Sequence, residues 1–390
     1  MKRYSVRYVT EYFFVFGYDA EDTGNIHPFA GTHGDPKMYT ETSDFVSSRR
    51  VLKKRSRIMG YQLEKQTADE IFNCLKQDYD IFAPKLFAGE GCFSDTDVIR
   101  YGKVESLDEI CWSRRSDYSF KEAFFPVNEV LFYFTEDSTS VPACRKKTAL
   151  IFLWSCDLHA LRRLDAIYLT NGPEDFYYKR LRENARFVLM GCEETCDTGF
   201  CVSMGTNCTE DYDLYLKVDG DSVLADLKTE EFQKYFSGKD CREREVIPDH
   251  VTENREKVTL PRNLSAETFS DPVWESYGSR CIGCGRCNFV CPTCTCFTMQ
   301  DIVYRDNENT GERRRVWASC QVDGYTDIAG GNSFRKNQGE RMRFKVMHKI
   351  YDFEKRFGFP MCVGCGRCDA VCPEYISYVN IINRLAKEEA

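Results

Sequence analysis

The sequence predicts an α+β protein in which a mixed α/β domain at residues 59–268 precedes a cysteine-rich, mainly α-helical domain at residues 269–390. Short apolar runs alternate with a helical pattern in the first part, as they do in α/β sheets. The second part contains two nearly identical cysteine motifs, CIGCGRCNFVCP at 281–292 and CVGCGRCDAVCP at 362–373. The 390 residues are enough for two or three domains with a sizeable core.

The elements of the α/β domain follow from its apolar pattern. Residues 61–85 fit a helix followed by a strand, and the run EVLFYFTE at 129–136 is typical of a buried strand. Two further strands are predicted at 149–155 and 186–191, and residues 157–169 between them have apolar side chains at helical spacing. Each of these two strands ends at a cysteine, where α/β sheets place their ligands.

The overall composition restricts the class of protein. A hydrophobic content of 42% and a charged content of 29% are ordinary for a globular protein, and a net charge of −8 does not favour nucleic acid as a partner. No apolar run is long enough to span a membrane, and the first residues lack the pattern of a secretory signal. We therefore expect a cytoplasmic protein that binds neither nucleic acid nor a membrane.

The 21 cysteines are unusual for such a protein. Disulfides are rare in the cytosol, the number of cysteines is odd, and many spacings are C-x-x-C. Thiols at that spacing are typical metal ligands, so a redox metal centre is predicted in preference to disulfides.

Both cysteine motifs read C-x-x-C-x-x-C-x-x-x-C-P, which is typical of bacterial ferredoxins that bind [4Fe–4S] clusters. The second domain is therefore predicted to be an α-helical, two-[4Fe–4S] ferredoxin-type domain. In two-cluster ferredoxins the fourth cysteine of each motif ligates the other cluster. The predicted ligands are Cys281, Cys284, Cys287 and Cys372 for the first cluster, and Cys362, Cys365, Cys368 and Cys291 for the second.

Structural zinc is the alternative for these motifs, but zinc knuckles use two C-x-x-C pairs and lack the third cysteine and the C-P. A cluster with four thiolate ligands has no position left for a substrate, so this domain is expected to conduct electrons and not to catalyse. The fourth cysteine of each motif is expected to begin a short helix. The motif glycines are expected to let backbone N–H groups approach the sulfur atoms.

Residues 293–361 form a long insertion between the motifs and are expected to fold on their own account. Cys294, Cys296 and Cys320 are expected to pack against the clusters, although a ligand role remains open. The basic residues near the end of the insertion fit either a cationic docking surface or a solvated helix at 341–355.

A third [4Fe–4S] site is predicted where the two strands of the α/β domain end, although its spacing is not a standard signature. A zinc site and unligated thiols are the alternatives. His159 lies in the same segment and is expected to be a polar neighbour of the site and not a ligand. The predicted ligands are Cys156, Cys192, Cys196 and Cys201.

From about Met59 to its end, the chain closely resembles the A subunit of anaerobic sulfite reductase. The resemblance rests on CDLHALRRLDAIYL, CVSMGTN, CIGCGRCNFVCPTCTCF, RRRVWASC, AGG and CVGCGRCDAVCPEYI, which occur in this order. The wider family includes the beta subunit of soluble NiFe hydrogenases (sulfhydrogenases). Family members can carry a C-F-C pair before V-S-M-G-T-N, whereas this chain has Gly199 at the first of those cysteines, with Cys196 as the candidate substitute.

The resemblance implies an iron–sulfur subunit that passes electrons from a flavin-bearing, NADH-oxidising subunit to a sirohaem subunit, where sulfite takes six electrons to become sulfide. The first alternative is the electron-transfer beta subunit of a NiFe hydrogenase, and a zinc-binding structural scaffold is the alternative of another class. The chain has no G-x-G-x-x-G after a strand and no phosphate-binding loop, so no nucleotide or flavin site is predicted on it.

Residues 1–58 lie outside the resemblance and end in the basic run RRVLKKRSRIMG. They fit a flexible basic arm that contacts a partner. The hypothesis that fits better is a translated leader before a natural start at Met59, because codons for Arg55-Ser56 can contain AGGAG, a bacterial ribosome-binding sequence.

Overall fold

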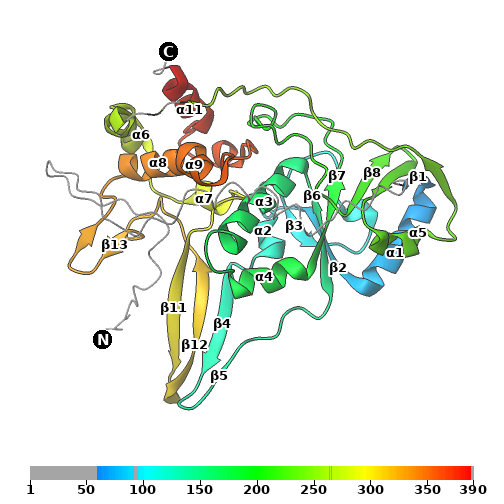
Figure 1. The fold of residues 1–390 in the computed structure, drawn as a ribbon, viewed down its shortest axis with the longest axis horizontal. Helices are drawn as coiled ribbons and strands as arrows, with labels where there is room; N and C mark the ends of the chain where they lie inside the picture. Colours follow the sequence, from blue (N-terminus) through cyan, green and yellow to red (C-terminus); the bar gives the residue numbers. More distant parts are fainter. Residues whose placement is uncertain (1–58, 92–94, 263, 265, 388–390) are drawn as a thin grey trace, which may run out of the picture. The chain divides into compact units, whose positions relative to one another are not determined.

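The computed structural model describes residues 59–91, 95–262, 264 and 266–387, and Met59–Ala390 form one compact unit (Figure 1). The two hypotheses about residues 1–58 lie outside the described residues. The fold class is the predicted one: a mixed α/β part is followed by a mainly helical, cysteine-rich part. No helix in the described residues is both long and apolar enough to cross a membrane.

The larger sheet has eight strands within the described part of the chain. Across the sheet they are β10 (Cys241–Arg244), β1 (Met59–Glu64), β9 (Ser222–Leu227), β8 (Leu214–Asp219), β7 (Ala185–Met190), β6 (Thr148–Leu153), β2 (Tyr79–Phe87) and β3 (Val98–Lys103). The central strands β2, β6, β7 and β8 are parallel, and the strands on either side of them are antiparallel. Strands β6 and β7 correspond to the two strands predicted to end at cysteines.

Helices cover both faces of this sheet (Figure 1). The helices are α1 (Lys65–Asp78), α2 (Lys121–Phe124), α3 (Ser155–Leu169), α4 (Phe176–Glu183) and α5 (Gln233–Phe236), with 3-10 turns η2 (Leu107–Glu109) and η3 (Glu230–Phe232). Strand β6 is buried on both faces: Phe152 packs in the core beneath α1 and α5, and Ile151 packs in the core beneath α3 and α4. This explains why β6 is a continuous apolar run without polar alternation.

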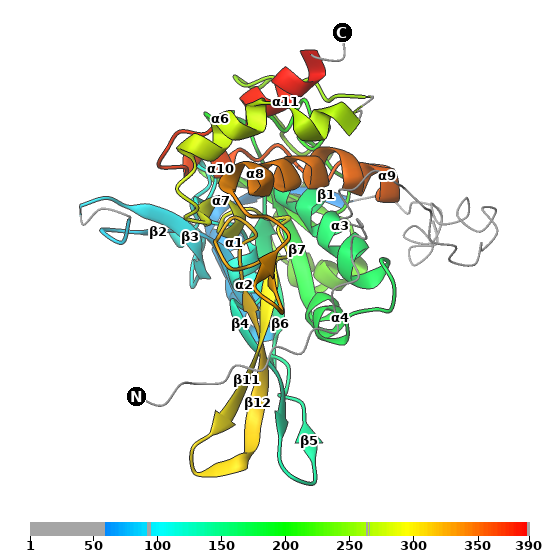
Figure 2. The same ribbon diagram turned by 90° about the vertical axis from the view of Figure 1, so that its left-hand side faces the viewer.

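The smaller sheet joins the insertion to the α/β part. Its order is β11 (Phe297–Tyr304), β12 (Asn307–Trp317), β4 (Asn128–Phe134) and β5 (Thr139–Ser140), and its hairpins project together (Figure 2). The insertion was expected to fold on its own account, and this expectation is wrong. An isolated two-stranded hairpin is marginally stable, and here β12 gains a partner by pairing antiparallel with β4.

The helical part packs around its own core. It contains η4 (Ala266–Ser270), α6 (Val273–Arg280), α7 (Arg286–Phe289), β13 (Asp327–Ile328), β14 (Asn332–Ser333), α8 (Gln338–Met347), the π-helical turn η5 (His348–Asp352), α9 (Phe353–Phe357), α10 (Arg367–Ala370) and α11 (Tyr378–Lys387). Trp274 of α6, Val346 of α8 and Ile382 of α11 lie in this core. The helix predicted at 341–355 is present as α8, η5 and α9.

A buried ion pair ties the helical part to the α/β part. Arg367 of α10 donates through Nη1 and Nη2 to the two carboxylate oxygens of Asp157 in α3, at 2.6 and 2.8 Å. Arg367 also donates through Nε to Ser116 O and through Nη2 to Ser116 Oγ. Both charged side chains of the ion pair are fully buried. A bidentate pair of this kind fixes both distance and orientation.

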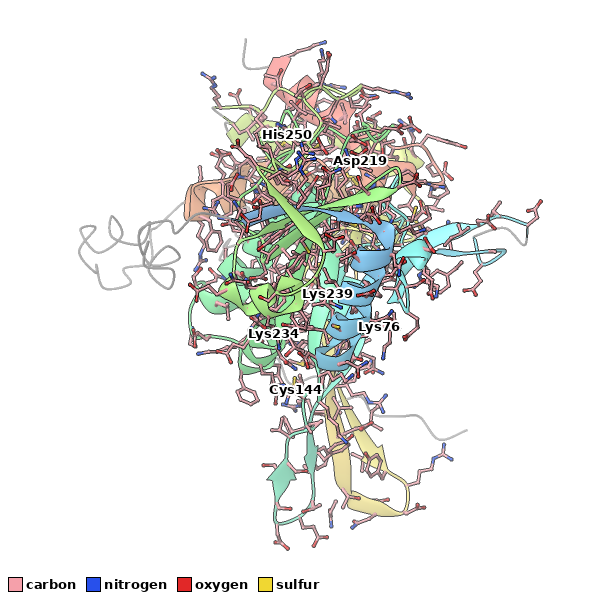
Figure 3. The ribbon with its side chains drawn as sticks, turned by 90° about the vertical axis from the view of Figure 1, so that its right-hand side faces the viewer. Lys76, Cys144, Asp219, Lys234, Lys239 and His250 are labelled. Atoms are coloured by element: carbon pink, nitrogen blue, oxygen red, sulfur yellow. The ribbon has the colours of Figure 1, made fainter. Side chains whose placement is uncertain are left out.

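We predict that Asp157→Asn lowers the free energy of unfolding by about 3–5 kcal/mol, because it leaves the Arg367 charge buried without its counter-ion. Anaerobic denaturant unfolding of the cluster-loaded protein, followed by circular dichroism, measures this. Lys234→Met is the control, since Lys234 is an exposed lysine on the face shown in Figure 3 that pairs with Asp78, and it should change little. Equal effects of the two variants would contradict the prediction.

Candidate functional site

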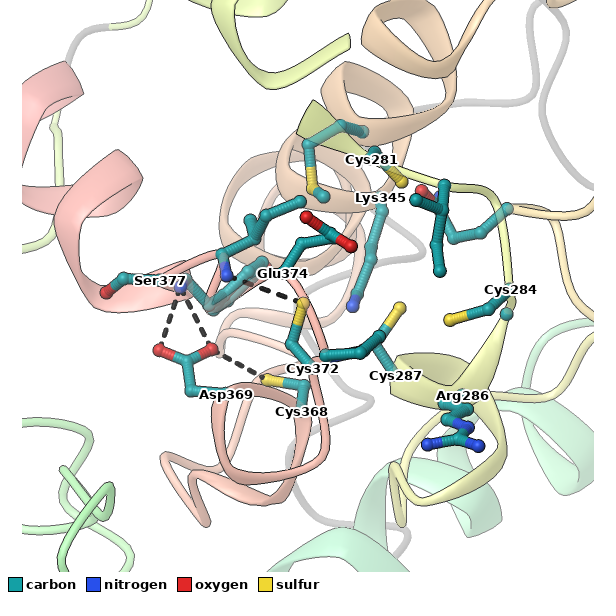
Figure 4. A pocket seen from close by; sticks show the side chains of 17 residues that line it. Cys281, Cys284, Arg286, Cys287, Lys345, Cys368, Asp369, Cys372, Glu374 and Ser377 are labelled. Atoms are coloured by element: carbon teal, nitrogen blue, oxygen red, sulfur yellow. Dashed lines mark hydrogen bonds between the residues drawn. The ribbon is translucent and has the colours of Figure 1, made fainter. Parts of the chain in front are cut away.

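The cysteines of the two motifs surround two neighbouring cavities. The thiol-bearing residues of the first cavity are Cys281, Cys284, Cys287, Cys368 and Cys372 (Figure 4). Those of the second cavity are Cys291, Cys362, Cys365 and Cys368. Each cavity therefore gathers three cysteines of one motif and the fourth cysteine of the other, and Cys368 lies in the wall of both.

The local fold of each motif depends on a glycine before its third cysteine. Gly285 and Gly366 have φ values of +74° and +72°, and the short helices α7 and α10 begin directly after them. The third cysteine thus lies inside the helix. The fourth cysteine was expected to begin a helix, but it follows the helix instead, because the left-handed glycine turns the chain earlier.

Backbone N–H groups donate to sulfur atoms in both cavities. Ile376 N–H donates to Cys372 Sγ at 3.4 Å in the first cavity, a contact that Figure 4 marks. Gly364 N–H donates to Cys362 Sγ at 3.4 Å in the second. Donors at this position stabilise negative charge on sulfur and tune a metal centre.

The second motif also packs directly on the segment that carries the third predicted site. Thr198 Oγ1 donates to Gly366 O, and Phe200 N–H donates to Gly364 O, each at 2.8 Å. A Cβ atom at Gly366 would lie 2.0 Å from Thr198 O, so only glycine allows this approach.

The four cysteines predicted for the third site lie near one another. Cys156 is in the first turn of α3 and Cys192 follows β7, as the strand pattern predicted. Burial, together with the neighbouring thiols of Cys196 and Cys201, raises the pKa of Cys192 to about 12. Burial also raises the pKa of Cys156, which interacts electrostatically with Cys201 and with Cys365 of the second cavity. The third group of thiols thus adjoins the second cavity.

One polar residue, Asn254, contacts this third group, and sequence reasoning did not find it. Asn254 Nδ2 lies 3.7 Å from Cys201 Sγ, and its Oδ1 accepts from Val202 N–H at 2.8 Å. Asn254 comes from a loop far along the chain without a recognisable motif, so no local signal marks it. His159 contacts Cys208 O through Nε2 at 2.9 Å, and Cys208 is not one of the four predicted ligands.

Of the remaining cysteines of the insertion, Cys294 lies beside Cys291 of the second cavity, whereas Cys296 and Cys320 lie beside each other. The interaction between the two thiols of Cys296 and Cys320 is the main cause that lowers the pKa of Cys320 to about 6, against the effect of burial. Asn288 Nδ2 also donates to Cys320 Sγ at 3.1 Å. Cys294, Cys296 and Cys320 line neither of the two cavities.

Lysines are buried beside the thiols. Lys121, Lys345 and Lys349 are 3–4% exposed. For Lys345 burial lowers the pKa, but the thiols of Cys287, Cys368 and Cys294 outweigh it and the pKa is raised. The interpretation of residues 341–355 as a solvated helix is therefore wrong for Lys345 and Lys349.

The donor set fits iron–sulfur clusters. Each cavity is lined by at least four thiols, and thiolates are the ligands of [4Fe–4S] clusters. Within the described residues, no three or more His, Cys, Asp or Glu side chains are grouped so as to hold a single metal ion. Burial raises the pKa of Cys362 to about 12, so cluster binding must displace protons from buried thiols.

Comparisons with known proteins agree with this geometry. Residues 280–376 match the 4Fe-4S dicluster domain family, so the chain binds two [4Fe–4S] clusters. Over 343 residues the chain is 31% identical to sulfhydrogenase 2 subunit beta of Pyrococcus furiosus, an alignment that covers 83% of this chain and 97% of the relative. No solved structure matches the chain significantly. With two cavities of ferredoxin type and a match along nearly the whole relative, the chain belongs to the sulfhydrogenase beta-subunit family of iron–sulfur electron-transfer subunits.

Proposed function

We propose that the chain relays single electrons from a flavin-bearing, NADH-oxidising subunit to a catalytic subunit of the same complex. The observation that carries this proposal is the continuity of the thiol groups: Cys156 adjoins Cys365 of the second cavity, and Cys368 lies in the wall of both cavities. Centres that share a wall are close enough to pass electrons without a mobile carrier. When bound, each cluster accepts and releases one electron.

The ligand sets proposed for the two clusters cross between the motifs. Cys281, Cys284, Cys287 and Cys372 hold the first cluster, and Cys362, Cys365, Cys368 and Cys291 hold the second. The cavity walls support this assignment, because Cys372 lies in the first cavity with the first motif, and Cys291 lies in the second cavity with the second motif. Crossing makes the fold of each motif depend on the other.

The two clusters differ in their access to a partner. Cys284 and Arg286 of the first motif are exposed, whereas Arg367, at the position equivalent to Arg286, is buried against α3. The first cluster thus lies at the outer end of the relay and exchanges electrons with a partner subunit. The second cluster lies inside, next to the α/β part.

We further propose a third [4Fe–4S] cluster held by Cys156, Cys192, Cys196 and Cys201. Their proximity to one another supports it, and so does the direct packing of residues 198–200 on Gly364 and Gly366. This cluster extends the relay into the sheet.

For the catalytic subunit, the motif resemblance favours a sirohaem subunit that reduces sulfite to sulfide. A NiFe hydrogenase is the second candidate, supported by the sulfhydrogenase relative. A relay of this kind serves either reaction equally well, because neither substrate reaches the clusters. The chain itself then has no catalytic residue, and it functions in the cytoplasm under anaerobic conditions.

The crossing of the ligands is tested by combining substitutions. We predict that Cys372→Ala and Cys284→Ala each remove one cluster's iron, and that the double variant loses no more than one cluster, because both residues hold the first cluster. Cys372→Ala combined with Cys365→Ala should instead lose both clusters. Iron analysis and electron paramagnetic resonance (EPR) of the dithionite-reduced proteins measure this. The reverse pattern would show that each motif holds its own cluster.

The third cluster is tested by Cys192→Ala. We predict the loss of one EPR signal and of one cluster's iron, while the signals of the other two clusters remain. Cys208→Ala is the matched control, since Cys208 is an exposed cysteine of the same segment and should keep all the iron. An unchanged iron content in Cys192→Ala, or stoichiometric zinc in the native protein, would contradict the proposal.

The catalytic partner is tested by anaerobic isolation of the complex from its own cells. We expect sirohaem absorption bands in the isolated complex, together with NADH-driven production of sulfide from sulfite. Nickel and hydrogen-dependent dye reduction would instead assign the chain to a hydrogenase. A colourless protein with zinc alone would contradict the relay itself.

A further inference from the structure

Helix α8 and the turn η5 carry two lysines at positions i and i+4 that face the cluster cavities. Lys345 is 4% exposed and Lys349 is 3% exposed. Among the described residues neither forms an ion pair with a carboxylate, and both line cavities that are walled by cysteines. An isolated buried ammonium group is costly, so a negative charge must balance it.

Lys345 lies between the two cavities. It lines both of them, and Figure 4 shows its amine directed into the first cavity. The carboxylate of Asp369 lines the same cavity but accepts from Tyr378 N–H at 2.9 and 2.8 Å. These bonds hold Asp369 at the start of α11, where it forms no ion pair with Lys345, although the charges of the two side chains attract each other.

Lys349 faces the second cavity alone. It lines that cavity, and its Nζ donates to Thr293 Oγ1 at 2.7 Å. Its electrostatic partners are Cys291, Cys294 and Cys362, two of which belong to the second ligand set. The two lysines therefore differ in which cluster they face.

The clusters supply the missing negative charge. A [4Fe–4S] cluster held by four thiolates is an anion, and the electron that it accepts makes it more negative. A fixed cation nearby favours the reduced form over the oxidised form and raises the reduction potential. In a buried site this effect is weakly screened.

We propose that Lys345 is the shared counter-charge of both clusters and raises both reduction potentials, while Lys349 raises the potential of the second cluster only. This inference rests on the crossed ligand sets of the proposed function. Lys345 is a positioning residue for charge and touches no substrate. It gives the insertion a role in the relay, because α8 brings this cation to the wall between the clusters.

The test is an anaerobic redox titration of the full chain, followed by EPR at each potential. Lys345→Met removes the charge and keeps the length of the side chain. We expect the ratio of reduced to oxidised cluster at a fixed potential to fall about tenfold for both clusters, which corresponds to about 59 mV for a one-electron centre. Lys349→Met should shift the second cluster alone.

Two control variants separate charge from packing. Lys345→Arg keeps the charge and should hold both potentials near those of the native protein. Lys336→Met removes an exposed lysine shortly before α8 and should change neither potential. If Lys345→Met loses a cluster that Lys345→Arg retains, the requirement for charge is supported. If both variants lose it, packing is responsible and the proposal is overturned.

Unchanged potentials in a Lys345→Met protein that still binds both clusters would also overturn the proposal, as would a shift of only one cluster. Failure of the proposed function itself looks different. In that case the native protein would lack two reducible clusters, or the paired cysteine substitutions would show uncrossed ligands, before any lysine is changed.

Discussion

The buried pair between Arg367 and Asp157 is the constraint on which the rest of the structure depends. Arg367 stands between the second and third cysteines of the second motif, and Asp157 stands next to Cys156 in the first turn of α3. One helical turn therefore fixes both the second motif and a cysteine of the third group. Because α3 begins directly after β6, the parallel sheet determines where the inner thiols lie.

Sequence patterns identified the chemistry but not the surroundings of the site. The sequence predicted the strands that end at Cys156 and Cys192, because local periodicity indicates strands. It also predicted the two cluster motifs, because the cysteine spacing is that of ferredoxins. The pairing of β12 with β4 could not be predicted from the sequence, since a contact between residues 130 and 314 depends on the tertiary fold. The burial of Lys345 and Lys349 was not predicted, because the basic residues of this segment were expected to be exposed to solvent. Lys345 and Lys349 repeat at i and i+4 beside the buried Val346 and Ile350, a spacing that marks one helix face.

Buried charge is handled in two different ways around the clusters. Arg367 has a carboxylate partner that offsets its charge, so its main contribution is structural, and the thiols of Cys365 and Cys156 also interact with it. Lys345 and Lys349 have thiols as their neighbours, so their stabilisation grows as the adjacent centre becomes more negative. The same physical cost of desolvation thus fixes the fold at one position and favours reduction at another.

The two cysteine motifs have nearly the same sequence but lie in different environments. Gly364 and Gly366 press against the backbone of residues 198–200, whereas Gly283 and Gly285 approach side chains of the insertion, Gln338 and Val322. The α/β part therefore covers the second motif, and the insertion covers the first. This asymmetry leaves Cys284 and Arg286 of the first motif exposed, whereas the second motif is enclosed by the α/β part. Unequal surroundings, and not unequal ligands, distinguish the outer centre from the inner one.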